Sequence, residues 1–180
     1  MAAPEPPVLA YIGLGSNLDD PRAQVARAMD ELAGLPGCTL AARSSLYATA
    51  PVGPVAQPDF VNAVVALATT LAPLALLGAL QGLERDHGRV RDGTRWGPRT
   101  LDLDLLLFGD LQIHLPGLVL PHPEMRRRAF VLVPLAEIAP GGLPIPGQGP
   151  LAELLAALDD RDWIRPVSTG AGAPGALSSR

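Results

Sequence analysis

The sequence contains no lysine, so all 14 of its basic residues are arginine. This absence excludes a P-loop lysine, a Schiff-base lysine and the strand lysine of protein kinases. Any bound anion must therefore be held by arginine, histidine, hydroxyl or backbone N–H groups. The single cysteine, Cys38, excludes an internal disulfide and every zinc site built from several cysteines. We expect a protein of a reducing compartment, the cytoplasm.

Charge is also scarce, because charged residues make up 18% of the 180 residues and hydrophobic residues make up 48%. This composition excludes a disordered chain and a coiled coil. The net charge of −4 argues against binding nucleic acid through overall charge. Residues 1–7 have neither the basic nor the apolar region of a secretion signal, so we expect no leader there.

One uncharged run, Phe60 to Leu83, is long enough to cross a membrane. Pro73 lies near its middle, and the composition changes there from β-branched residues to leucine. We therefore expect a buried strand followed by a helix, and no association with a membrane.

The expected elements follow the order β-α-β-β-α-β over the first 110 residues. This order is typical of an α+β, ferredoxin-like fold, a largely antiparallel sheet with packed helices that forms an α/β/α sandwich. Residues 1–164 are expected to form one catalytic domain, and residues 165–180 a disordered tail rich in Gly, Ala, Ser and Pro. The expected strands are 8–15, 39–49, 60–69 and 100–108, with helices from Pro21 and Pro73, helical turns at 125–137 interrupted at Pro134, and a short helix at 151–158.

Asp102 and Asp104 form the sharpest chemical pattern in the chain. Residues two apart on a strand share a face, so both carboxylates project together while the leucines between and beside them face the other way. Two such carboxylates repel each other, and a divalent cation between them relieves the repulsion. The pair is therefore suited to Mg²⁺ bound together with a phosphorylated substrate. The alternative is an exposed strand face that happens to carry two acids.

The segment before this pair is strongly basic. Residues 85–99 hold five arginines and two aspartates, a local charge of +3 in an acidic chain. Arginine binds phosphate oxygens through parallel hydrogen bonds, so the segment suits a polyphosphate. Its glycines permit closure over a ligand, and Trp96 can stack or exclude water. The alternative is a solvated loop, which is the better interpretation for Arg85.

Two other patterns are weaker. His122 precedes three consecutive arginines, of which at most two can face one ligand, and a lone histidine is more often structural. Gly13, Gly15 and Ser16 follow a strand as in a dinucleotide-binding motif, but Leu18 replaces the third glycine and no parallel unit follows. We reject that motif and expect these glycines to serve backbone turns.

Taken together, these segments resemble the 6-hydroxymethyl-7,8-dihydropterin pyrophosphokinase family. The likeness covers residues 8 to 160, and its most specific run is Arg95-Trp96-Gly97-Pro98-Arg99-Thr100-Leu101-Asp102-Leu103-Asp104. The other matching segments are Tyr11–Asn17, Gln57–Ala63, His122-Pro123, Arg128, Phe130–Leu132 and Pro134–Pro140.

The resemblance implies transfer of a pyrophosphoryl group from ATP to the hydroxymethyl oxygen of the dihydropterin, with release of AMP. It implies that Asp102 and Asp104 hold two Mg²⁺ ions bridging the ATP phosphates. It assigns phosphate contacts to Arg89, Arg91, Arg99, His122 and Arg128, ATP-side positions to Gln81 and Glu84, and a closing loop to Arg89, Arg91 and Trp96. Glu84 could equally be a surface acid at a helix end.

For the pterin, the resemblance implies that Phe60 and Phe130 sandwich the ring and that Asn62 reads its edge. Backbone groups of Thr49 and Val52 lie in the matching loop. Asn62 in an apolar run needs a polar partner, which a pterin edge would supply. Phe60 could otherwise belong to the core.

Two other functions are compatible with the sequence. One is a non-catalytic module of this fold that binds pterin or nucleotide, although binding alone would not need paired carboxylates. The other is a different Mg²⁺-dependent nucleotide enzyme with a cyclase-like fold, which would leave Phe60, Asn62 and Phe130 unexplained. We expect ATP and 6-hydroxymethyl-7,8-dihydropterin as the ligands, no nucleic acid, and a monomer.

Overall fold

The computed structural model describes residues 5–51, 53–54, 56–88, 100–158 and 164–167. A six-stranded sheet lies at its centre, in the order β10-β3-β4-β1-β5 with β2 also paired to β4, and every pairing is antiparallel. The elements are β1 (Val8–Ser16), α1 (Pro21–Ala33), β2 (Cys38–Arg43), β3 (Tyr47–Thr49), β4 (Phe60–Thr69), α2 (Pro73–Asp86), β5 (Asp102–Phe108), β6 (Ile113–Leu115), β7 (Leu118–Leu120), the 3₁₀ turn η1 (Met125–Arg127), α3 (Ala129–Ile138), β8 (Pro144–Ile145), β9 (Gly149–Pro150), α4 (Leu151–Ala156) and β10 (Ile164–Pro166).

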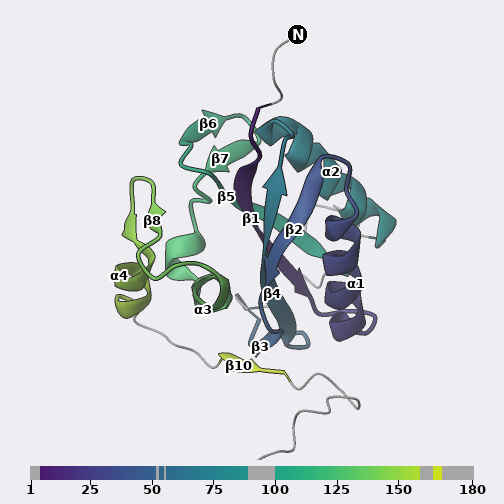
Figure 1. Ribbon diagram of the computed structural model, residues 1–180. Coiled ribbons are helices and arrows are strands. Elements are labelled where there is room, and N and C mark those ends of the chain that lie inside the picture. Colours follow the sequence, from purple (N-terminus) through teal and green to yellow (C-terminus); the bar gives the residue numbers. More distant parts are fainter. Residues whose placement is uncertain (1–4, 52, 55, 89–99, 159–163, 168–180) are drawn as a thin grey trace, which may run out of the picture.

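The expected α+β sandwich is confirmed. Helices α1 and α2 cover one face of the sheet, and α3 and α4 lie on the other side, as Figure 1 shows. The two central strands β1 and β4 are neighbours, and β5 joins the sheet beside β1. This arrangement is the βαββαβ order with its crossovers, and its antiparallel ladders agree with the rejection of a dinucleotide-binding fold.

Alternation along the strands divides the core into two layers. On β1, Ala10, Ile12 and Leu14 pack with the buried faces of α1 and α2, while Tyr11 packs with α3 on the opposite side. Residues two apart share a face, so each strand contributes side chains to both layers. A fully buried leucine or isoleucine of this kind stabilises the fold by about 1.5–3 kcal/mol.

The run that resembled a membrane span is a strand and a helix, as predicted. It forms β4 and then α2, and Pro73 is the first residue of that helix. Proline is tolerated at this position because its missing N–H would have no partner there. Among the described residues, no helix is both long and apolar enough to cross a membrane.

Residues 39–49 do not form the single strand that we predicted. The strand breaks between β2 and β3, where the Ser44 hydroxyl accepts a hydrogen bond from Val64 N at 2.9 Å and Ser44 N donates to Val64 O at 2.9 Å. Ser45, the next residue, binds the Glu137 side chain of α3 through its N–H and its hydroxyl. A short polar side chain here competes with the regular ladder, which explains the break.

Two further predictions were wrong. Pro134 lies inside α3 and does not interrupt it: the helix continues to Ile138, and the proline is buried. The tail does not begin at residue 165, because Arg165 and Pro166 belong to β10, which pairs with β3. Pairing with β3 holds this strand, and composition does not show that pairing.

Candidate active site

Asp102 and Asp104 lie on the face of the sheet that α3 covers. Leu103 and Leu105 are buried in the opposite layer, so the two carboxylates share the other face, as the alternation predicted. Both side chains are half-buried. In the register of β1 and β5, Asp102 lies opposite Gly15 and Asp104 opposite Gly13.

The two glycines are not at turns, which corrects our expectation. Both lie within β1, and Gly15 stands between Asp102 on β5 and Asn62 on β4. A Cβ on Gly15 would lie 2.8 Å from Asn62 Oδ1 and 3.9 Å from Phe60 Cδ1. Because Gly15 has no side chain, the surface of the sheet between the two carboxylates and the Asn62 amide is left uncovered by a side chain at this position.

Asn62 is 6% exposed, and its amide is oriented by a buried hydroxyl. Its Nδ2 donates to Thr49 Oγ1 at 2.6 Å. This bond directs Oδ1 toward the space above Gly15, since the two ends of an amide point in different directions. The contact involves the Thr49 side chain, whereas the resemblance pointed to the Thr49 backbone.

The two expected aromatic residues come from opposite layers around this uncovered surface. Phe60 is the first residue of β4 and shares the face of Asn62, two residues further along. Phe130 lies in the first turn of α3, and the Arg128 guanidinium stands 5.4 Å from its ring centroid. Both rings are half-buried, so each can offer a face to a flat ligand.

His122 is held beside the outer edge of β5. Its backbone N–H donates to Leu106 O at 2.9 Å, and its ring Nδ1 accepts from Glu124 N at 3.2 Å. Burial lowers the pKa of His122, as does the nearby charge of Arg128, against the opposing effects of Glu124 and Asp102. A neutral ring that accepts at Nδ1 carries its proton on Nε2, which can donate to a phosphate oxygen.

Glu84 is not a surface acid, because it is 2% exposed. Its Oε2 accepts a hydrogen bond from Leu103 N at 2.9 Å, on the outer edge of β5 between the two aspartates. Gln81 lies half-buried one turn earlier on α2. Contact of either residue with ATP stays a prediction.

Sequence reasoning did not assign a role to Asn17. Its Nδ2 donates to Gln57 Oε1 and to Pro58 O, both at 2.9 Å, so it ties the end of β1 to the segment that leads into Phe60. The signal was present, because Asn17 and Gln57 both lie in segments that carried the family likeness. Spacing alone did not reveal that the two segments meet.

Several predicted residues lie outside the described part of the chain: Val52, Arg89, Arg91, Trp96 and Arg99.

Within the described part, no group of three or more His, Cys, Asp or Glu residues is arranged to hold a metal ion. Asp102 and Asp104 supply two oxygen-bearing ligands on one face. This donor set fits Mg²⁺, which binds through one or two carboxylates and completes its shell with phosphate and water.

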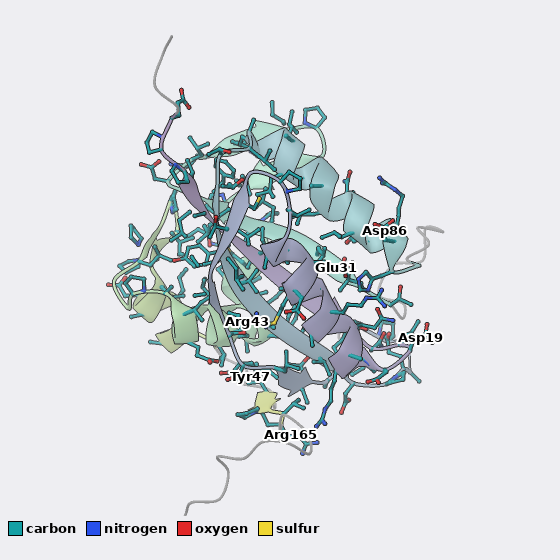
Figure 2. All side chains as sticks on the ribbon, turned by 45° about the vertical axis from the view of Figure 1, so that its right-hand side comes forward. Asp19, Glu31, Arg43, Tyr47, Asp86 and Arg165 are labelled. Carbon is teal, nitrogen blue, oxygen red and sulfur yellow. The ribbon has the colours of Figure 1, made fainter. Side chains whose placement is uncertain are left out.

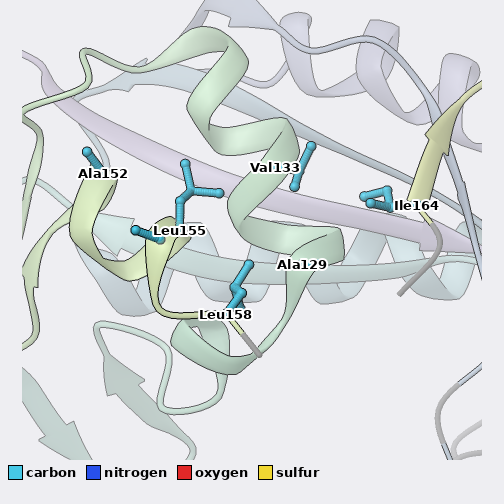
Figure 3. Close-up of a pocket in the computed structure, with 7 residues that line it drawn as sticks. Ala129, Val133, Ala152, Leu155, Leu158 and Ile164 are labelled. Carbon is cyan, nitrogen blue, oxygen red and sulfur yellow. The ribbon is translucent and has the colours of Figure 1, made fainter. Parts of the chain in front are cut away.

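A separate apolar cavity of 420 Å³ lies between α3, α4 and β10 (Figure 3). Its lining includes Val133 of α3, Leu155 of α4 and Ile164 of β10. No side chain in the lining is polar, so the cavity offers nothing to orient a nucleotide or a pterin. The polar face between β5 and β4 is therefore the better candidate for the reaction site.

The chain is similar to proteins of known function over most of its length. The family model described as 7,8-dihydro-6-hydroxymethylpterin-pyrophosphokinase (HPPK) matches residues 11–140. A protein of Pseudomonas aeruginosa named 2-amino-4-hydroxy-6-hydroxymethyldihydropteridine pyrophosphokinase is 56% identical over 147 residues, which are 82% of this chain and 90% of that protein. Its namesake in Haemophilus influenzae is 45% identical over 158 residues, which are 88% of this chain and 98% of that protein.

Among solved structures, the chain is similar to Plasmodium falciparum HPPK-DHPS in a crystal structure with pteroate. The TM-score is 0.65 at 15% identity, over 86% of this chain and 43% of that one. The present chain thus spans less than half of that protein. At this identity the likeness concerns the fold alone.

Proposed function

Because the chain belongs to the 7,8-dihydro-6-hydroxymethylpterin-pyrophosphokinase family, we propose that it transfers the β,γ-pyrophosphoryl group of ATP to the hydroxymethyl oxygen of 6-hydroxymethyl-7,8-dihydropterin. The chain is an ATP-dependent pyrophosphokinase of folate biosynthesis. In the proposed reaction the hydroxymethyl oxygen forms a bond to the β-phosphorus. The bond from that phosphorus to the α,β-bridging oxygen breaks, its electron pair stays on that oxygen as AMP leaves, and the proton of the hydroxymethyl group is released to solvent.

The observation that carries the proposal is the row Asn62, Gly15, Asp102 across three neighbouring strands. The Asn62 amide, which can form hydrogen bonds with a heterocycle, lies on one side of Gly15, and the paired carboxylates lie on the other side. A pterin bound at Asn62 would therefore direct its substituent toward Asp102. Such positioning matters because phosphoryl transfer depends on alignment and on charge stabilisation more than on covalent help from the protein.

Asp102 and Asp104 would hold Mg²⁺ together with the phosphates of ATP. The bound metal would neutralise phosphate charge and hold the reacting oxygens in line. The role of the protein is to fix the two carboxylates, which strand β5 does through its pairing with β1 on one side and the Glu84 contact on the other.

His122 and Arg128 supply donors beside the carboxylates. His122 Nε2 can donate a hydrogen bond, and the Arg128 guanidinium adds a positive charge close to Phe130. We assign both to the phosphate chain, because each donor would stabilise negative charge that moves onto the leaving group. The phosphate contacts of Arg89, Arg91 and Arg99 and the loop closure that involves Trp96 stay proposals drawn from the family likeness.

Phe60 and Phe130 would hold the pterin by its faces, and Asn62 Oδ1 would accept from an N–H on its edge. An aromatic sandwich and one amide suit a flat polar ring, because stacking supplies affinity and the hydrogen bond supplies orientation. The orientation of the Asn62 amide by Thr49 supports this assignment.

Product analysis tests the proposal directly. The purified chain is incubated with ATP, Mg²⁺ and 6-hydroxymethyl-7,8-dihydropterin, and the nucleotides and pterins are separated. Equal amounts of AMP and pterin diphosphate are expected. Release of ADP would mean ordinary kinase chemistry with a different site of attack. Saturable pterin binding without any product would favour the non-catalytic binding module.

A further inference from the structure

The carboxylate of Glu137, in the last turn of α3, binds three donors: two from Ser45, in the link between β2 and β3, and one from Tyr47, the first residue of β3. Tyr47 Oη donates to Glu137 Oε1 at 2.7 Å, and Ser45 Oγ donates to Oε2 at 2.9 Å. Ser45 N lies 3.0 Å from both carboxylate oxygens. These residues are about 90 positions apart in the sequence, so the cluster joins two elements that the chain itself does not connect.

The two joined elements carry opposite walls of the proposed pterin site. Tyr47 and Thr49 are two apart on β3 and share a face, and Thr49 is the residue that orients the Asn62 amide. Phe130 and Glu137 are seven apart on α3, which is close to two helical turns, and so they also share a face. The Glu137 contacts thus connect the wall that bears the amide to the wall that bears the aromatic ring.

Pairing within the sheet does not fix the spacing between these walls. β3 has three residues and is paired to β4 on one edge and to β10 on the other. Figure 2 shows Tyr47 and Arg165 close together at this end of the sheet. Both ladders hold β3 in the plane of the sheet, whereas the distance from β3 to α3 is set between layers. The hydrogen bonds of Glu137 join α3 to Ser45 and Tyr47 and so act between the helix layer and the sheet.

We propose that Glu137 is a positioning residue for the pterin, which sets the gap between Phe130 on α3 and the Thr49–Asn62 pair on the sheet. The inference rests on the proposed function, because it assumes that the pterin lies between these walls. A rigid ring between two faces is sensitive to their separation, since dispersion contacts weaken within less than an ångström of displacement. Glu137 touches neither substrate and acts only through these elements.

The ionisation states of Glu137 and Tyr47 are those that these hydrogen bonds require near neutral pH. Partial burial alone would raise the pKa of Glu137, but the hydrogen bonds from Tyr47 and from Ser45 N and Oγ outweigh it and lower the pKa. Burial, together with the bond to Glu137 and its charge, raises the pKa of Tyr47 to about 12. Near neutral pH the carboxylate is therefore ionised and the phenol protonated, which is the state in which every donor has its acceptor.

The test compares four variants of the full chain: Glu137→Ala, Glu137→Gln, Tyr47→Phe and the control Glu153→Gln. Glu153 is an exposed glutamate on the neighbouring helix α4. Pterin affinity is measured by titration with fluorescent 6-hydroxymethylpterin in the presence of Mg²⁺ and a non-hydrolysable ATP analogue. KM for ATP and Tm are measured on the same preparations.

We expect Glu137→Ala to weaken pterin binding by about tenfold, because three hydrogen bonds to a charged acceptor are lost together. KM for ATP should stay within about twofold. Glu137→Gln should have an intermediate effect, since its single carbonyl oxygen faces three donors. Tyr47→Phe should weaken binding by about two- to threefold, because it removes only one of the hydrogen bonds that Glu137→Ala removes.

Two results would overturn the inference. One is a lowered Tm for Glu137→Ala with pterin affinity unchanged, which would make the cluster a purely structural contact. The other is an equal loss for pterin and ATP, which would mean a general distortion. Both differ from failure of the proposed function, in which the wild-type chain binds pterin and yields no AMP. A wild-type chain that does not bind pterin at all would overturn both.

Discussion

Glu84 Oε2 accepts a hydrogen bond from Leu103 N at 2.9 Å. Leu103 is the residue between Asp102 and Asp104. In the part of the chain that the structure describes, β5 is the edge strand of the sheet, and no strand pairs with the outer side on which this N–H lies. A buried carboxylate from α2 takes the place of that missing strand. The two aspartates are therefore fixed by a group on the opposite side of the strand that bears them.

Glu84→Ala should lower the free energy of unfolding by about 2–3 kcal/mol, because it removes a buried hydrogen bond to a charged acceptor and leaves Leu103 N unpaired. Glu84→Gln keeps an acceptor oxygen and should lose less. The Mg²⁺ concentration at half-maximal rate should rise in the same order, more for Glu84→Ala than for Glu84→Gln, because a less firmly held β5 positions the carboxylates less well. Urea denaturation and a Mg²⁺ titration measure the two effects. Equal behaviour of the Ala variant and the wild type would remove Glu84 from this role.

The paired carboxylates give the most direct prediction about turnover. Asp102→Asn and Asp104→Asn should each reduce the rate of AMP release by at least about 10²-fold, because each removes a charged ligand from the metal that neutralises the phosphates. Tm should change little, since both side chains are half-buried and face the site.

Asp110→Asn is the matched control for these variants. Asp110 is an exposed aspartate shortly after the same strand, and its replacement should leave the rate unchanged. AMP release is followed by chromatography at saturating ATP and pterin. A rate near that of the wild type in the Asp104→Asn variant would show that the metal is held elsewhere.

The central part of the fold could be predicted because its signals are local. The apolar run of β4 and the proline that opens α2 each fix an element boundary by themselves, and both boundaries are where we expected them. The break between β2 and β3 and the strand β10 depend on partners far along the chain. Ser44 binds Val64, and β10 is held by β3, and neither contact leaves a periodic pattern in the sequence.

For the site, the spacing of Asp102 and Asp104 was enough to place both on one face, because strand alternation is a local rule. The role of Gly15 was missed, since it follows from the register of three strands rather than from the spacing of glycines. The Glu137 cluster was missed for the same reason. Glu137 is an exposed glutamate in an apolar helix pattern, and nothing in that pattern indicates that it binds Ser45 and Tyr47, about 90 residues away.

The Glu137 cluster also predicts a pH dependence of stability. A carboxyl whose pKa is lowered by folding contributes stability above its unfolded pKa, and this contribution is lost as the pH falls through the folded value. Tyr47, the titratable partner that Glu137 faces, has its pKa raised to about 12, so its contribution is complete below its ordinary value of 10.0. The Tm difference between the wild type and Glu137→Gln should therefore be constant from about pH 6 to pH 9 and shrink below about pH 4. Thermal unfolding across this range measures it, and a difference that does not change in acid would contradict the assignment.

Gly15 and Gly13 allow a matched comparison within one strand, because both lie on β1 and face the same layer. A Cβ on Gly15 would lie 2.8 Å from Asn62 Oδ1, whereas a Cβ on Gly13 would meet Leu106 Cδ1 at an ordinary 3.5 Å. The amide cannot turn aside freely, since its Nδ2 is bound to Thr49 Oγ1.

Gly15→Ala should therefore displace the oxygen that reads the pterin edge and weaken pterin binding by about tenfold or more, the cost of one well-placed hydrogen bond in a buried site. Gly13→Ala should leave the affinity within about twofold. Titration with 6-hydroxymethylpterin measures both, and Tm shows whether each variant is folded. Unchanged affinity in a folded Gly15→Ala variant would mean that Asn62 Oδ1 does not contact the pterin, and the edge of the ring would then have to be read by another group.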